Sequence, residues 1–405
     1  MPYRRYVLDI DRLRADIPAY SDTTGQSPVF LDSAGSSLPP RVVLDTVISH
    51  LRREAEIGGY RAAAERLDDL DAARSDIATL INAAPASIAL SDSASRSWSD
   101  FFYSVPLEPE DRILISGSDY ASNAIAALQR ARVTGATVET IPSDSTGQLD
   151  LEALADMVDD RVKLVSLLHV PTNGGLINPV AEATAIAHRV GALVLLDACQ
   201  AVGQIDIDVT DLGVDALSAT GRKWLRGPRG TGFLYVRPEV CRDLEPGRLD
   251  LRGAAWIDPA EYRVADDATR FEFSECDVAA RLGLGAAVRY LLDLGPAAVY
   301  SAISDNAEYL RLHLPGIPGV SVHDLGTRFA GIVSFTVTGR DPLEIRDRLR
   351  ESDVTITASH RASTLLDMTA RGLDTVLRAS PHAFVSTGEL DRFLDALDAA
   401  ITRGD

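Results

Sequence analysis

The segment LVLLDACQAVG, residues 193–203, decides the fold. Residues 192–196 are almost wholly apolar, which is typical of a parallel strand covered by helices on both faces. The strand ends at Asp197, and open α/β sheets bind their ligands at the carboxyl ends of strands. A second segment, LSATGRKW at residues 217–224, places a lysine beside glycine, arginine and tryptophan. Together the two segments predict a ligand site at the edge of a parallel sheet.

Strand and helix patterns alternate on both sides of residues 193–203. A helix is expected over 41–57, and strands are expected over 88–90, 112–116, 162–168 and 192–196, with helices beginning near 123 and 179 between them. This alternation is typical of a doubly wound α/β domain. We therefore assign residues 26–265 to a large α/β domain that carries the ligand site.

The pattern changes beyond residue 265. The expected elements there are a long helix over 277–294, strands over 332–337, 354–357 and 375–380, a helix over 342–351 and a closing helix after the capping sequence at 386–389. This order predicts a smaller α+β domain over 266–405. Residues 1–25, with a short amphipathic helix at 9–17, are expected to pack on that small domain.

Charge and cysteine content limit the possible functions of this 405-residue chain. The net charge is 40 − 59 = −19, so nucleic acid and anionic lipid are disfavoured as partners. The three cysteines, Cys199, Cys241 and Cys276, are far apart in the sequence, which argues against disulfides and structural zinc, and no metal site is expected. No apolar run approaches ~18–20 residues and the N-terminus does not resemble a secretory signal, so we expect a cytoplasmic protein without a membrane span.

Lysine is rare in this chain, and Lys223 stands in the second segment. Of the forty basic residues only Lys163 and Lys223 are lysines, so a lysine is expected where arginine cannot replace it. Formation of a Schiff base is such a role, because a guanidinium stays protonated. With Asp197 as partner of a pyridine nitrogen, Lys223 predicts pyridoxal phosphate (PLP) as cofactor. The alternative is that Asp197 only caps the next helix and Lys223 is exposed to solvent.

From residue 31 to residue 382 the chain resembles the class V aminotransferase-fold enzymes, which include cysteine desulfurases, selenocysteine lyases and kynureninases. The resemblance implies a PLP-dependent transferase of fold type I that forms a homodimer with active sites at the interface. It also implies a small amino-acid substrate. Catalytic roles are implied for Lys223, Asp197 and Tyr120, with the ring of Tyr120 stacked on the cofactor.

Further site residues are carried over from the resemblance position by position. The implied cofactor contacts are Ser93, Ala94, Ser95, Tyr120, Thr172 or Asn173, Asp197, Gln200, Thr220, Arg222 and Lys223. Arg378 matches the arginine that binds the substrate α-carboxylate. The other implied substrate contacts are Ser33, Tyr60, His360 and Arg361. For Tyr60 the alternative is a glycine-rich helix end, and for His360 and Arg361 it is ordinary surface polarity.

One departure from the family pattern bears on the reaction. Desulfurases carry a nucleophilic cysteine on a loop before the carboxylate arginine, whereas residues 357–364 here are TASHRAST. We therefore expect a C–S β-lyase acting on a cysteine S-conjugate or sulfoxide, releasing a thiol or sulfenate with pyruvate and ammonia. In EAEIGGY at 54–60 and RKWLRGPRG at 222–230 the chain resembles actinobacterial C–S lyases of ergothioneine biosynthesis and related enzymes of lincosamide antibiotic pathways. Decarboxylating oxidative deamination, epimerisation and a non-catalytic PLP-binding role remain as alternatives.

Overall fold

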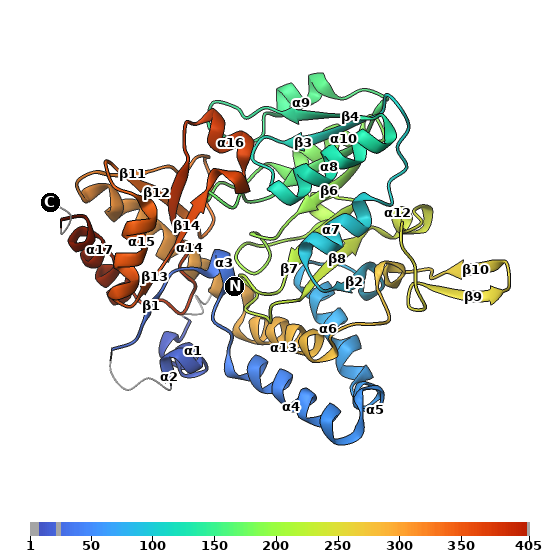
Figure 1. Ribbon diagram of the computed structural model, residues 1–405, viewed down its shortest axis with the longest axis horizontal. Coiled ribbons are helices and arrows are strands. Elements are labelled where there is room, and N and C mark those ends of the chain that lie inside the picture. The colour runs from blue at the N-terminus through green and yellow to red at the C-terminus, as the bar shows by residue number, and fades with distance from the viewer. Residues whose placement is uncertain (1–7, 22–25, 403–405) are drawn as a thin grey trace, which may run out of the picture.

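The computed structural model describes residues 8–21 and 26–402 (Figure 1). A seven-stranded sheet forms its centre, in the order β2-β8-β7-β6-β5-β3-β4. The strands are β2 (Ile88–Ser91), β3 (Arg112–Ser116), β4 (Thr137–Ile141), β5 (Val162–Leu168), β6 (Leu193–Asp197), β7 (Ala216–Thr220) and β8 (Gly232–Val236). β8 runs antiparallel to both of its neighbours, and the other pairs are parallel. The sheet is therefore mixed at one edge and parallel where the expected site lies.

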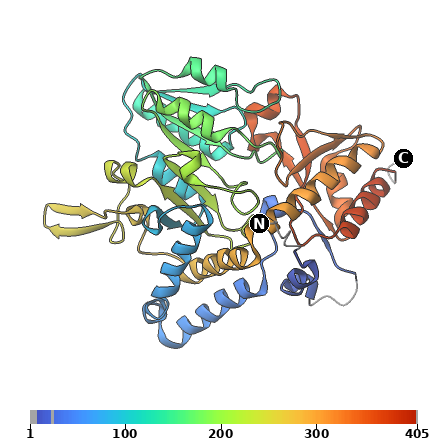
Figure 2. The ribbon, with the colours of Figure 1, turned by 180° about the vertical axis from the view of Figure 1, so that it is seen from behind.

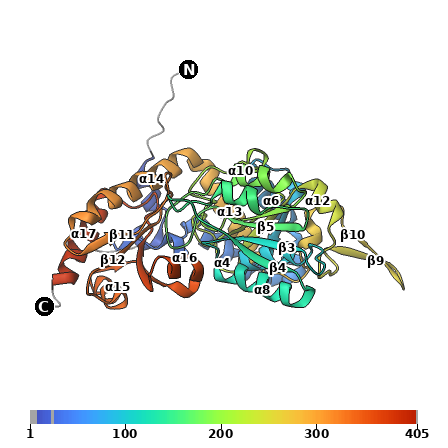
Figure 3. The same cartoon turned by 90° about the horizontal axis from the view of Figure 1, so that it is seen from above.

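Helices cover both faces of this sheet, as Figure 3 shows for α8 and α10. The helices of this part are α4 (Arg41–Ile57), α5 (Gly59–Ala64), α6 (Leu67–Leu80), α7 (Ala94–Phe102), α8 (Ala121–Thr134), α9 (Leu151–Met157), α10 (Val180–His188), α11 (Val209–Leu212) and α12 (Pro238–Asp243), with the 3-10 turn η1 (Pro85–Ser87). Leu195 packs in the core under α7, whereas its neighbours Val194 and Leu196 pack in the core on the other face. This alternation of side chains confirms the doubly wound α/β architecture.

The C-terminal part contains a second sheet, with strands in the order β11-β12-β15-β14. Its strands are β11 (Val320–Val322), β12 (Val333–Val337), β14 (Thr357–His360) and β15 (Thr375–Ala379), and all neighbours are antiparallel. The helices here are α14 (Pro296–His313), α15 (Pro342–Glu351), α16 (Leu365–Ala370) and α17 (Thr387–Thr402), with the 3-10 turns η3 (Leu314–Gly316) and η4 (Arg361–Ser363). Figure 2 shows α14 running along this sheet from behind.

Two segments pack against the part of the molecule that lies outside their expected domain. β1 (Val29–Phe30) pairs in parallel with β13 (Val354–Thr355), so residues assigned to the large domain join the C-terminal part. α13 (Val278–Leu294), assigned to the small domain, packs instead on α4 and α6. α13 packs there because its face is apolar and contains glycine. At Gly285 the two helices are so close that an added Cβ would lie 2.5 Å from the Cβ of Ala73. A glycine at the contact, which has no side chain, allows the two helices to approach closely.

The N-terminal helices lie between the two parts. They are α1 (Ile10–Ala15) and α2 (Pro18–Ser21), followed after β1 by α3 (Ser33–Ser36). Arg14 forms an ion pair with Glu389 of α17, and the ring of Tyr20 contacts that of Phe384 at 5.7 Å between centroids. Asp16 accepts a hydrogen bond of 2.8 Å from the Tyr290 hydroxyl of α13. Residues 1–7 and 22–25 of the expected N-terminal segment are outside the described residues.

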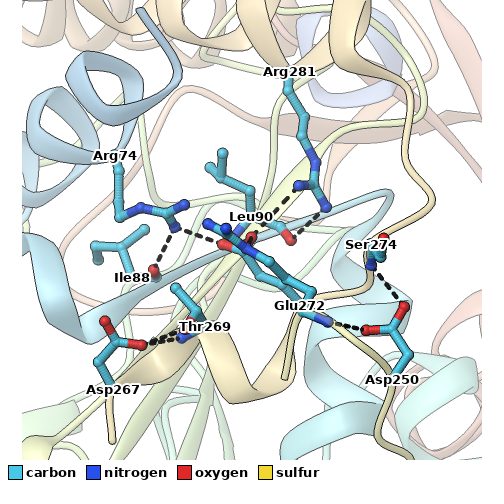
Figure 4. A network of polar contacts seen from close by, with 10 residues as sticks. Arg74, Ile88, Leu90, Asp250, Asp267, Thr269, Glu272, Ser274 and Arg281 are labelled. Atoms are coloured by element: carbon cyan, nitrogen blue, oxygen red, sulfur yellow. Dashed lines mark hydrogen bonds and ion pairs between the residues drawn. The ribbon is translucent and has the colours of Figure 1, made fainter. Parts of the chain in front are cut away.

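Two features stand out from the body of the molecule. A hairpin of β9 (Ala254–Asp258) and β10 (Glu261–Val264) projects at one end (Figures 1 and 2). Behind it η2 (Ala268–Phe271) leads to Glu272, whose buried Oε1 accepts hydrogen bonds from Arg74 Nη1 at 2.5 Å and the Leu90 amide at 2.8 Å (Figure 4). Glu272 therefore ties the segment after the hairpin to α6 and β2.

No single helix among the described residues has both the length and the apolar character needed to cross a membrane. α13 and the stretch 296–316 pass that test only as a pair, and the pair is bent by 86°. Within the described ranges, no cluster of three or more His, Cys, Asp or Glu side chains could hold a metal ion.

Candidate active site

A cavity opens where β5, β6 and β7 end and where α7 and α8 begin. Its lining consists of Ser93, Ala94, Ser95, Tyr120, Ser122, Asn123, Leu168, Val170, Thr172, Asp197, Cys199, Gln200, Thr220, Arg222 and Lys223. Every residue that the sequence suggested for the cofactor, except Asn173, is in this set. Residues from five chain segments meet here because the parallel strands all end at the same edge.

Lys223 follows β7 and its side chain lines the cavity. Burial lowers the pKa of its amine to about 8, and the neighbouring charge of Arg222 acts in the same direction, against the opposing effect of Cys199 and Asp197. A neutral amine is therefore accessible near physiological pH, as a nucleophilic or basic lysine requires. The alternative of a solvent-exposed surface lysine does not fit this position.

Asp197 is the last residue of β6 and is 5% exposed. Its Oδ1 accepts a hydrogen bond from the Cys199 amide and its Oδ2 accepts one from Asn123 Nδ2, both at 2.9 Å. The carboxylate thus caps the turn after the strand, as the alternative interpretation suggested, and it also lines the cavity. A carboxylate oxygen accepts more than one hydrogen bond, so a protonated ring nitrogen could still be bound.

Residues 93–95 line the end of the cavity that is suited to bind an anion such as a phosphate group. Ser93 is the N-cap of α7, and its Oγ accepts a hydrogen bond of 3.1 Å from the Arg96 amide. The first amides of a helix attract phosphate through their free N–H groups and the helix dipole. β8 passes close beneath, because a Cβ on Gly232 would lie 2.8 Å from the Ser93 carbonyl carbon. Only a residue without a side chain leaves this turn undisturbed.

Thr220 and Arg222 line the same cavity, but both have partners within the chain. Thr220 Oγ1 donates a hydrogen bond of 3.4 Å to the Thr231 carbonyl. Arg222 Nη1 donates to the carbonyl of Gly35 in α3. The positive charge of Arg222 therefore stays at the cavity while its side chain also holds the N-terminal loop in place.

Gln200 and Thr172 join the cavity to the arginine expected to bind a carboxylate. Gln200 Nε2 donates a hydrogen bond of 3.2 Å to Thr172 Oγ1, and Gln200 Oε1 accepts one of 3.0 Å from the Trp224 indole. Arg378 Nη1 donates to the carbonyl and the hydroxyl of Thr172, each at 3.0 Å. Arg378 is buried, and among the described residues its Nε has no hydrogen-bond partner.

Asn173 is turned away from the cavity. Its Nδ2 donates hydrogen bonds of 3.0 and 2.9 Å to the hydroxyls of Ser363 and Thr364. Of the two adjacent candidates, Thr172 is therefore the one that faces the cofactor cavity, and Asn173 instead fastens the 361–364 segment to the wall of the site. A cofactor contact by Asn173 stays a prediction, and this geometry favours Thr172 instead.

None of the five predicted substrate contacts lines the cavity: Arg378 adjoins it through Thr172, and the other four lie elsewhere. Ser33 is buried and its Oγ lies 3.0 Å from Ser37 Oγ. His360 and Arg361 are exposed and face Asp374, with N–O distances of 3.6 and 3.2 Å. Tyr60 is 94% exposed and lies on α5, which Figure 1 shows at the periphery of the molecule, away from the strand ends. Within one chain these residues are thus surface or supporting groups, and the carboxylate partner Asp374 explains why His360 and Arg361 point outward.

Two polar residues beside the cavity, Asn123 and Asp119, are not among the site residues expected from the sequence. Asn123 lines the cavity and is bonded to Asp197, and Asp119 lies behind Asn123 with 3.1 Å between Asn123 Nδ2 and Asp119 Oδ1. Burial, followed by the charge of Asp197, raises the pKa of Asp119 to about 7. The available signal was the sequence DYASN at 119–123, in which an aspartate and an asparagine lie on either side of the start of a helix that follows a strand.

The site fits PLP by the chemistry of its groups. It offers a lysine amine with a lowered pKa, a fixed carboxylate, a helix start for a phosphate and an unpartnered arginine nitrogen for a carboxylate. This combination on a doubly wound sheet defines a PLP-dependent enzyme of fold type I.

The family model for class V aminotransferases matches residues 29–393, so the chain belongs to that family. A cysteine desulfurase from Dickeya dadantii is 29% identical over 399 residues, covering 96% of both chains. A probable cysteine desulfurase from Mycolicibacterium paratuberculosis is 28% identical over 401 residues, and there the chain spans 96% of its own length but 58% of the relative.

Solved structures confirm the fold. An apo cysteine desulfurase from Thermococcus onnurineus superposes with a TM-score of 0.88 at 24% identity, covering 100% of both chains. A cysteine desulfurase from Escherichia coli gives the same TM-score at 22% identity, covering 98% of this chain and 99% of that one. The cystine C–S lyase C-DES, solved with cysteine persulfide, gives 0.81 at 24% identity over 92% of this chain and 97% of its own.

Proposed function

We propose that this enzyme is a PLP-dependent C–S β-lyase that cleaves a cysteine S-conjugate or a cysteine sulfoxide. The observation that carries the proposal is the segment 357–364, which forms β14 and η4 beside the cavity wall and contains no cysteine. A desulfurase needs a thiol there to accept the sulfur atom. Elimination needs no such protein nucleophile, because the sulfur departs with its own substituent.

None of the three cysteines is suited to replace that thiol. Cys199 lines the cavity, but burial, reinforced by the charge of Asp197, raises its pKa well above the usual value, and a protonated thiol is a poor nucleophile. Cys241 is buried in α12, and burial raises its pKa to about 11. Cys276 lies beyond Glu272, outside the cavity lining, and burial raises its pKa as well.

Arg378 would orient the substrate. Thr172 holds its Nη1, so that the unpartnered Nε and the remaining N–H groups are available to a carboxylate. Asp32 lies 3.4 Å from Nη2 and would compete for the guanidinium until a substrate carboxylate arrives. The α-carboxylate of an amino acid would thus be held next to Thr172 and Gln200, at the open side of the cavity.

Lys223 would then move the proton. When bound, PLP supplies an electron sink that stabilises negative charge at the substrate Cα. The Lys223 amine, with its pKa lowered to about 8, removes the Cα proton as general base. Asp197 would keep the opposite end of the site negative. Once Lys223 holds the Cα proton, the β-substituent would leave with the C–S bonding electrons as thiolate or sulfenate, and aminoacrylate would be the released product. Addition of water to aminoacrylate gives pyruvate and ammonia.

We also propose that the enzyme acts in a secondary-metabolite or low-molecular-weight thiol pathway, such as those of ergothioneine or lincosamides. The support for this proposal is the sequence resemblance together with the departure at 357–364. The similarity to C-DES, described as a cystine C–S lyase, agrees with elimination on this fold. We further propose a homodimer and a cytoplasmic location.

The decisive experiment offers the PLP-loaded enzyme free cysteine, S-alkyl cysteine and S-alkyl cysteine sulfoxide in parallel. We expect pyruvate and ammonia in equal amounts from the conjugates. Alanine together with enzyme-bound persulfide from free cysteine would show a desulfurase and overturn the proposal. Release of CO₂ with oxygen uptake would show oxidative deamination, and recovery of the D-isomer without pyruvate would show an epimerase.

A further inference from the structure

At the wall of the cavity, three polar side chains form a continuous chain of hydrogen bonds, with Asp197 and Asn123 in the lining and Asp119 behind them. Asp119 ends the loop after β3, Asn123 lies in the first turn of α8, and Asp197 ends β6. Asn123 Nδ2 donates to Asp119 Oδ1 at 3.1 Å and to Asp197 Oδ2 at 2.9 Å. All three are at most 5% exposed. One amide group, which has two hydrogens, therefore serves one carboxylate with each.

We propose that Asn123 and Asp119 are positioning residues for the cofactor: Asn123 fixes the Asp197 carboxylate in the orientation that binds the PLP ring nitrogen, and Asp119 fixes Asn123. The inference rests on the PLP site and is independent of which sulfur substrate the enzyme cleaves.

The geometry leaves Asp197 no other orientation. Its Oδ1 is held by the Cys199 amide and its Oδ2 by Asn123, so rotation of the carboxylate breaks one bond or both. Removing a partner from a buried polar group costs its desolvation, about 1–3 kcal/mol. Without Asn123, Asp197 Oδ2 would lose its 2.9 Å hydrogen bond, and the carboxylate could turn away from the ring.

Asp119 is held as firmly as Asn123. Its Oδ1 also accepts a hydrogen bond of 2.8 Å from the Tyr120 amide, and its Oδ2 accepts one of 3.1 Å from Ser166 Oγ on β5. Asn123 bridges the two carboxyl groups, and burial, followed by the charge of Asp197, raises the pKa of Asp119 to about 7. Where Asp119 is ionised, it adds negative charge behind the position that a protonated ring nitrogen would occupy.

The test compares Asn123→Leu and Asp119→Asn with the matched control Asn306→Ala. Asn306 Nδ2 also donates two hydrogen bonds, of 3.1 and 2.9 Å, but to the carbonyls of His382 and Val385 away from the cavity. The readouts are the dissociation constant for PLP and the ¹⁵N resonance of ring-labelled PLP, which reports whether the ring nitrogen carries a proton.

For Asn123→Leu we expect PLP affinity to fall about tenfold, the loss expected for one hydrogen bond to a charged group, and the ring-nitrogen resonance to move toward the neutral form. Asp119→Asn should move the resonance in the same direction by less. Asn306→Ala should leave both readouts unchanged even if it lowers thermal stability.

Wild-type affinity and an unshifted resonance in both variants would overturn the inference. If Asn123→Leu does not fold, Asn123→Ser decides, because the smaller hydroxyl cannot reach both carboxylates and should give the same shift. No sulfur substrate is used, so a failure of the proposed lyase activity would not affect the outcome. Failure of the wild-type chain to bind PLP would instead overturn the site itself.

Discussion

At the scale of single residues, Lys223 is the residue that we propose to carry the chemistry, and the scarcity of lysine makes this role easy to test. The chain has a single other lysine, Lys163, which is exposed at the start of β5 and donates to the Asp160 carbonyl. Borohydride reduction of the PLP-loaded enzyme followed by peptide mapping should modify Lys223 alone. Lys223→Arg should abolish activity while Lys163→Arg keeps it, because a guanidinium does not form the covalent bond to the aldehyde. Labelling at Lys163 would contradict the assignment.

The pH dependence of cofactor attachment follows from the pKa of Lys223. Burial lowers that pKa from 10.5 to about 8, so below pH 8 the amine is mostly protonated and has no free electron pair. The rate at which the apoenzyme attaches PLP should therefore rise about tenfold per pH unit below the midpoint and level off above pH 8. Stopped-flow absorbance between pH 6 and 10 measures this. A rate still rising at pH 10 would mean that the amine is solvated.

At the scale of elements, the contact between β8 and the start of α7 controls the phosphate end of the site. A Cβ at Gly232 would lie 2.7 Å from the Ala219 carbonyl oxygen and 2.8 Å from the Ser93 carbonyl carbon, and neither backbone atom can move easily. Gly232→Ala should weaken PLP binding about tenfold or more by displacing the first turn of α7. Gly59→Ala is the control, because no atom lies within 4 Å of its added Cβ. Equal PLP affinities in the two variants would refute this role for Gly232.

The Glu272 network holds the segment after the hairpin to α6 and β2. The Glu272 side chain is fully buried and pairs with Arg74, while Arg252 and Arg281 lie at 3.4 and 3.5 Å from its Oε2 (Figure 4). Glu272→Gln should lower the free energy of unfolding by about 3 kcal/mol, because a buried arginine loses its counter-charge. Denaturant unfolding of the apoenzyme measures this, with the exposed Glu65→Gln expected to have no effect. A similar small effect for both would show that the network contributes little.

At the scale of the whole molecule, exposed apolar side chains gather on the parts that project. Leu51 and Tyr60 on α4 and α5, and Leu251, Trp256 and Tyr262 on or beside the hairpin, are all at least half exposed. Such clusters mark interaction surfaces more often than free surface. They agree with the proposed homodimer.

Sedimentation should accordingly give a species of twice the 43.5 kDa chain mass. Tyr60 is outside the lining of the active-site cavity formed by its own chain, so we expect it to contact substrate from a partner subunit. Tyr60→Ala should raise KM several-fold without changing PLP affinity. A monomeric, fully active enzyme would refute both the dimer and the shared site.

The sequence by itself determined the α/β architecture and the pair Asp197 and Lys223. Both depend on local patterns: an apolar strand predicts where its carboxyl end lies, and residues after neighbouring parallel strands must meet at one edge. The resemblance added most of the cavity lining, because those residues also follow strand ends or begin helices. Fold and cavity were thus largely predictable.

Side-chain direction was decided only by the tertiary structure. Asn173 turns away from the cavity because its partners, Ser363 and Thr364, are supplied by a segment nearly two hundred residues further along the chain. Asn123 reaches Asp197 only because the folded chain brings the first turn of α8 to the end of β6. A hydrogen bond between distant segments leaves no periodic signal in the sequence, so whether a polar residue faces the site or supports it depends on contacts that form only when the chain is folded.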